Sequence, residues 1–108
     1  MNFNLYQLTS KTTAIYPREC AIEYCALGLA GEAGEVANKI AKVLRDQNGK
    51  FTDENIDAIS GEIGDTLWML SQLATELGLV LGDIANENID KLQDRQQRGV
   101  IGGSGDKR

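Results

Sequence analysis

Four acidic residues stand in two pairs, Glu32 with Glu35 and Glu62 with Asp65, and each pair is three positions apart. On an α-helix, residues at this spacing are neighbours on one face. Two such helices side by side would bring four carboxylates into one space, where repulsion and lost hydration raise their pKa values. Mg²⁺ relieves this conflict because it takes oxygen ligands and commonly bridges protein carboxylates to phosphates. The spacing therefore predicts a magnesium site formed by these four residues.

The acids lie beside the apolar stripes of their predicted helices. Glu32 falls about 60° from Leu29 of one stripe, where another apolar residue would be expected. Glu62 and Asp65 fall about 100° and 160° to one side of Ile63 on the other stripe. The alternative is that all are ordinary solvated carboxylates, but a purely solvated face would lie opposite the stripe. The shared displacement favours a metal site.

Five glycines fall inside the same two predicted helices: Gly28, Gly31, Gly34, Gly61 and Gly64. Each costs about 1 kcal/mol relative to alanine in a helix interior. We therefore expect that they allow close helix contact or leave space for a ligand. The alternative is a turn at residues 31–34, but the apolar register continues across that segment.

The hydrophobic pattern predicts helices that position these acids, with breaks where glycine and polar residues cluster. We predict helices at residues 4–13, 19–45, 53–78 and 81–97. Thr52 or Asp53 can cap the third helix at its start, and Gly78 suits its end. Short helices joined by turns cannot bury their stripes singly, so we expect an all-α, four-helix bundle-like fold completed by oligomerisation. Residues 1–98 would form one domain, followed by a glycine-rich tail at 99–108.

Composition restricts the function further. A net charge of −5 argues against a large basic surface for a nucleic-acid polymer. The chain has no histidine, so catalysis must rely on carboxylates, lysine or metal. Cys20 and Cys25 would diverge by about 140° on a helix, which predicts reduced, structural thiols. No secretory signal or membrane-spanning run is recognisable, and we expect a cytoplasmic protein.

The predicted fourth helix carries a polar set along its core-like stripe. Asn88 occupies an apolar position of that stripe, and Lys91 and Arg95 follow on the same face. We predict that Asn88 hydrogen-bonds a base or sugar and that the two cations meet phosphate oxygens. The alternative is an interhelical hydrogen bond beside cations that extend to solvent. Lys39 on the second helix is predicted either to contact phosphate or to pair with Glu35.

With these residues identified, the sequence resembles the MazG-like, all-α nucleoside triphosphate pyrophosphohydrolase family. The segments that carry the resemblance are LGLAGEAGEVANKIAKVLRD (residues 27–46), GEIGDTLWML (61–70), ENIDKLQDRQQRG and the GGSGDKR ending. The family signature E-x-x-E followed by E-x-x-D matches the four acids, and the resemblance also implies a substrate role for Asn88 and Lys91. The resemblance implies hydrolysis of a nucleotide to its monophosphate and pyrophosphate, with Mg²⁺ on the four acids.

The expected mechanism is attack on a substrate phosphorus by a water that the metal activates, with Glu35 orienting that water. Four carboxylates and a triphosphate carry a charge of about −8, which requires roughly two or three Mg²⁺ ions for balance; Mn²⁺ is an expected substitute. We expect a dimer or tetramer. The alternative function is a non-enzymatic oligomerisation or regulatory module with a vestigial acidic patch.

Overall fold

The computed structural model describes residues 1–108 and contains four α-helices and no strand. In chain order the helical elements are α1 (Phe3–Lys11), the short 3₁₀ helix η1 (Arg18–Cys20), α2 (Ala21–Asp46), α3 (Asp53–Glu76) and α4 (Leu81–Arg98). The all-α prediction is confirmed, and each predicted helix end lies within about two residues of the observed one.

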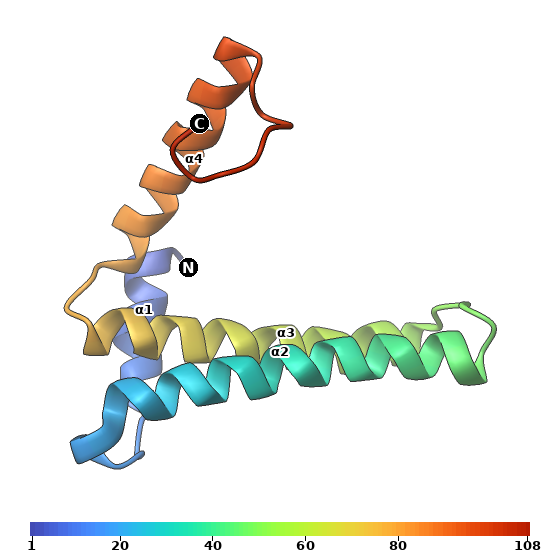
Figure 1. The fold of residues 1–108 in the computed structure, drawn as a ribbon. Helices are drawn as coiled ribbons and strands as arrows, with labels where there is room; N and C mark the ends of the chain where they lie inside the picture. The colour runs from blue at the N-terminus through green and yellow to red at the C-terminus, as the bar shows by residue number, and fades with distance from the viewer.

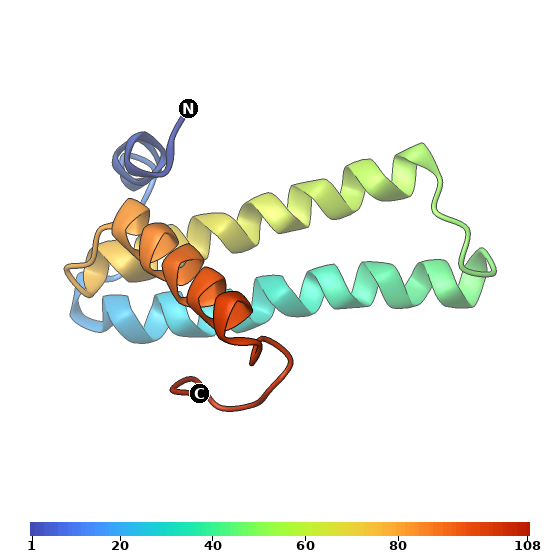
Figure 2. The same cartoon turned by 90° about the horizontal axis from the view of Figure 1, so that it is seen from above.

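The two long helices α2 and α3 lie side by side as an antiparallel hairpin (Figures 1 and 2). Their connection turns through Asn48 and Gly49, which adopt φ values of +53° and +75°. Thr52 caps α3 by accepting from the Asn55 N–H, while the Asn55 side chain accepts from the Thr52 N–H. This reciprocal cap satisfies backbone donors that a helix start leaves free.

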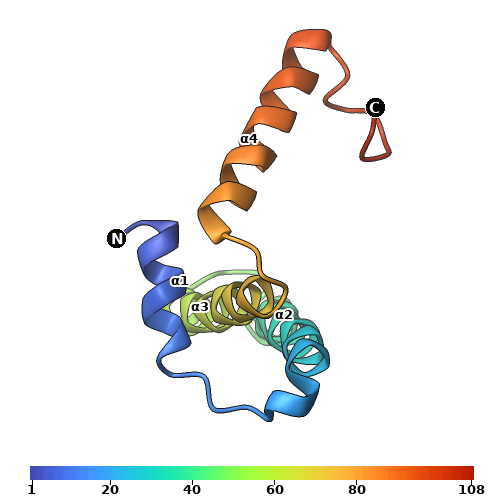
Figure 3. The same ribbon diagram turned by 90° about the vertical axis from the view of Figure 1, so that its left-hand side faces the viewer.

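The helix α1 crosses one end of the hairpin, and α4 leaves from the same end (Figure 3). Gly78, at φ +73°, ends α3, and the Leu79 N–H donates to Ala74 O at 2.8 Å. Gln7 of α1 then holds the start of α4, because its Oε1 accepts from the Leu81 N–H at 2.7 Å. Beyond this anchored first turn, α4 projects away from the hairpin (Figure 1).

The buried core lies at the crossing end. Tyr16, Ala21 and Cys25 form its centre, and Trp68 and Leu73 pack against them. The Trp68 ring meets Tyr16 edge-on at 6.3 Å, and its Nε1 donates to Thr13 Oγ1. Trp68 therefore serves packing.

The crossing of α1 over α3 is polar. Ser10, Ser71 and Gln72 are buried there, and the Gln72 Nε2 donates to Ser10 Oγ at 2.9 Å. The apolar stripe of α3 that contains Ile63 was expected to be buried, and this prediction is wrong in part. Four of its heptad-spaced residues are at least 43% exposed, namely Ile56, Ile63, Leu70 and Leu77. The helix α1 covers a different face of α3, at Ser71 and Gln72, and these four residues stay exposed.

Neither cysteine forms a disulfide, as predicted; Cys25 is fully buried and Cys20 is partly exposed. None of the helices combines the length and apolarity needed to cross a bilayer.

Candidate metal centre

The antiparallel hairpin brings acids from α2 and α3 to one place. One carboxylate oxygen each from Glu32, Glu62 and Asp65 lies within 4.8 Å of the others. Glu32 and Glu62 are half-buried, and Asp65 is exposed. The sequence separation of 30 residues between Glu32 and Glu62 is therefore closed by the register of the hairpin.

The cluster is electrostatically strained in the free protein. Burial and the nearby carboxylates of Asp65 and Glu62 raise the pKa of Glu32 above its ordinary value. Lys39 offers partial compensation, since its Nζ lies 3.6 Å from a Glu62 oxygen. Three converging carboxylates with a single cation nearby form a donor set that suits a hard divalent cation such as Mg²⁺.

Glu35 lies outside this cluster. Its side chain is exposed, and it does not belong to the group of converging oxygens. It follows Glu32 by one helical turn, close enough that its charge contributes to the raised pKa of Glu32. The fourth predicted ligand is thus adjacent to the three that meet.

Lys39 pairs with Glu62 of α3, so the predicted ion pair with Glu35 is wrong. The lysine points across the hairpin because Glu62 faces it from the neighbouring helix. Lys39 also lines a cavity of about 190 Å³ with Lys42, Gln47 and Asn55. These polar side chains adjoin the acidic cluster through Lys39.

The predicted substrate residues of α4 do not meet the acids within one chain. Asn88 is exposed on α4, and α4 makes no contact with α2 (Figure 1). Lys91 is half-buried and Arg95 is buried, both under residues of the 99–108 segment. Within one chain, α4 therefore holds these cations away from the acids.

Sequence reasoning missed Tyr6, Lys42 and Asn55. Burial and the Asp65 charge raise the pKa of the Tyr6 phenol, so α1 contributes an aromatic residue near the cluster. No sequence signal could indicate this proximity, because it depends on how α1 crosses α3. Lys42 could have been predicted from the sequence, since it follows Lys39 by three positions on α2 and so lies on the same helix face.

The helix glycines next to the acids border open space. A Cβ added at Gly31, Gly34, Gly61 or Gly64 would meet nothing within 4 Å. Only Gly28 shows the expected close contact, because a Cβ there would lie 2.5 Å from the Met69 thioether. The other four thus leave room beside the carboxylates.

Comparison with known proteins agrees with this arrangement. Residues 21–100 match the MazG nucleotide pyrophosphohydrolase domain, a range that includes the three clustered acids and all of α4. The chain therefore belongs to the MazG nucleotide pyrophosphohydrolase family. It is also similar to the Gene 37 protein of Mycobacterium phage L5, with 46% identity over 114 residues and full coverage of both chains. No solved structure matches the chain.

Proposed function

We propose that this protein is a Mg²⁺-dependent nucleotide pyrophosphohydrolase that cleaves (d)NTP to (d)NMP and pyrophosphate. The observation that carries the proposal is the convergence of Glu32, Glu62 and Asp65 on the hairpin of a MazG-family chain. A cytoplasmic location is part of the proposal, and the free thiols fit it. Residues 1–98 would form one domain, followed by a tail at residues 99–108.

The three clustered carboxylates and Glu35 would hold about two or three Mg²⁺ ions, with Mn²⁺ as a substitute. When bound, these cations supply charge neutralisation for the triphosphate and a lowered pKa for the attacking water. Glu35 has no lysine or arginine partner, so a carboxylate oxygen that does not ligate the metal would orient that water and accept its proton. Lys39 would neutralise Glu62 and face the phosphates from the cavity wall.

We further propose that the protein works as a homo-oligomer, a dimer or tetramer. Its accessible surface is 7574 Å², whereas a compact monomer of this mass would expose about 5,900 Å². The excess, roughly 1,700 Å² per chain, is in the range of a stable dimer interface. In such an assembly Asn88, Lys91 and Arg95 of one copy would bind the nucleotide held by the acids of another.

The function is tested by pyrophosphate release from a panel of NTPs and dNTPs, in Mg²⁺ and in EDTA. We expect metal-dependent release with at least one nucleotide. Glu35→Gln and Asp65→Asn should each lower kcat by about 100-fold or more while helical circular dichroism stays unchanged. Glu87→Gln, an exposed change on α4, is the matched control and should retain activity.

Two results would contradict the proposal. Full activity in either acid variant would remove the site assignment. No metal-dependent turnover with any nucleotide would favour the non-enzymatic module with a vestigial acidic patch.

A further inference from the structure

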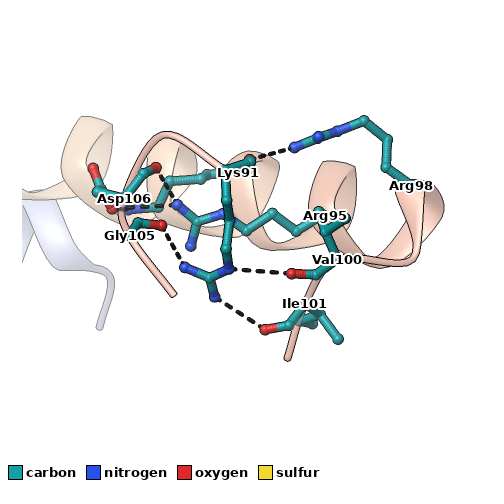
Figure 4. Close-up of polar contacts among 8 residues, drawn as sticks. Lys91, Arg95, Arg98, Val100, Ile101, Gly105 and Asp106 are labelled. Atoms are coloured by element: carbon teal, nitrogen blue, oxygen red, sulfur yellow. Dashed lines mark hydrogen bonds and ion pairs between the residues drawn. The ribbon is translucent and has the colours of Figure 1, made fainter. Parts of the chain in front are cut away.

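The segment after α4 folds back onto the helix (Figure 4). Asp106 Oδ1 accepts a hydrogen bond from Lys91 Nζ at 2.7 Å and lies 3.3 Å from Arg95 Nη2. The same guanidinium nitrogen donates to the backbone carbonyl of Asp106. One carboxylate oxygen is therefore shared by two cations that are neighbours on one helix face.

A second set of contacts shapes the segment itself. The Arg108 guanidinium donates to the carbonyls of Val100, Ile101 and Gly105 at 3.1, 3.0 and 2.6 Å. Gly105 has a φ of +86°, a left-handed conformation that glycine adopts without strain. The segment is thus a defined loop that presents Asp106 to Lys91 and Arg95.

The burial of the partners is unequal. The Arg95 side chain is 6% exposed, whereas that of Asp106 is 79% exposed. A nearly buried guanidinium requires an anionic partner, and Asp106 supplies the only carboxylate that it contacts. The two cations in turn hold the pKa of Asp106 below its ordinary range. The cationic side is built into the helix, and the anionic side is carried on a glycine-containing loop.

We propose that Lys91 and Arg95 form a phosphate-binding site that the Asp106 carboxylate occupies in the free protein, and that a phosphate group displaces this carboxylate. Arg95 cannot reach a ligand while the loop covers it, so phosphate binding and loop opening are one event. A tethered carboxylate competes at an effective concentration of about millimolar, which a multiply charged pyrophosphate group can exceed by binding both cations.

Identification of that phosphate group with the nucleotide or its pyrophosphate product rests on the proposed function. The exchange of one anion for another does not, because it involves no residue of the acidic cluster. It can therefore be measured in EDTA, without metal and without turnover.

The test is calorimetric titration of the full chain with pyrophosphate in EDTA at low ionic strength, with inorganic phosphate and sulfate in parallel. Asp106→Asn removes the competing charge and should bind pyrophosphate about three- to tenfold more tightly than the unmodified protein. Asp94→Asn is the matched control, because Asp94 pairs with Arg98 on the same helix at 2.8 Å. It should change the affinity by less than about twofold.

A second variant and a second measurement complete the test. Adding Lys91→Met to Asp106→Asn should abolish the gain in affinity. In NMR spectra of the unmodified protein, pyrophosphate should shift the amide signals of Gly103 and Gly105 toward those of a mobile chain. Unchanged or weaker binding by Asp106→Asn, or unchanged loop signals at saturation, would overturn the proposal. If the gain occurs but no nucleotide is hydrolysed, the exchange stands and the proposed enzymatic function fails.

Discussion

Glu32 is the residue at which folding and metal binding oppose each other. Its carboxylate is half-buried between Glu62 and Asp65, and its folded-state pKa is raised. A carboxyl group with a raised folded-state pKa favours the folded state when protonated. Its stabilising contribution is therefore present below the ordinary glutamate value and is lost as the pH rises through the raised value. At neutral pH the ionised form weakens the metal-free fold.

The change Glu32→Gln should therefore stabilise the metal-free protein. In EDTA at pH 7.5 we expect the free energy of unfolding to rise by about 0.5–1 kcal/mol, because one of three converging charges is removed. The advantage over the unmodified protein should shrink as the pH falls through the raised pKa of Glu32. Urea titrations at pH 7.5 and pH 5 measure this difference, and Glu87→Gln should show none. A less stable Glu32→Gln protein in EDTA at pH 7.5 would contradict the interpretation that the ionised Glu32 destabilises the metal-free fold.

The E-x-x-[ED] spacing was enough to predict that acids of two helices share a face, and three of them meet. It was not enough to place Glu35 outside the cluster or to pair Lys39 with Glu62. Those details depend on the distance between two helix axes and on side-chain rotamers. Neither is encoded in the residue spacing of a single helix.

At the scale of elements, the hairpin is specified by local chemistry at its ends. The turn at Asn48 and Gly49, the Thr52–Asn55 cap and the left-handed Gly78 are all recognisable in the sequence, so the helix limits were predictable. The buried face of α3 was not, because α1 packs on a polar face of α3, at Ser71 and Gln72, and much of the apolar stripe stays exposed. Helix periodicity identifies a stripe but not the neighbour that covers it.

Two glycines form a matched pair for testing these local effects. A Cβ at Gly61 or at Gly78 would meet nothing within 4 Å, but only Gly78 has a positive φ, of +73°. Gly61→Ala should raise the free energy of unfolding of the metal-free protein by about 0.5–1 kcal/mol. Gly78→Ala should lower it by about 1–2 kcal/mol. Chemical denaturation measures both, and a destabilised Gly61→Ala protein would mean that another copy of the chain fills the open space.

At the scale of the whole molecule, the single chain is extended. Its radius of gyration is 16.8 Å, against about 13 Å for a compact domain of this length. The long α2–α3 hairpin and the projecting α4 account for this shape (Figure 1). A sequence can reveal that apolar faces exist, but the direction in which α4 leaves the hairpin depends on the Gln7–Leu81 hydrogen bond.

The exposed face of α3 makes the oligomer testable by one substitution. Leu70 lies centrally on this face and is 43% exposed. If this apolar face is the oligomer interface, Leu70→Glu would place a charge in it. Light scattering after size exclusion should then show a mass near 11.7 kDa, against a multiple of it for the unmodified protein. Ile15→Glu is the control, because Ile15 is 96% exposed outside the helices and should leave the oligomer intact. A monomeric unmodified protein at high concentration would contradict the proposal.

The two cysteines should be alkylated at different rates. Cys20 is partly exposed at the start of the hairpin and should react with an alkylating reagent in the native state. Cys25 is buried and should react only when the crossing end opens. The ratio of the two alkylation rates therefore measures how often that end opens locally. Because α4 begins at the same end, the alkylation rate of Cys25 should also rise if displacement of the loop on α4 makes the crossing end open more often.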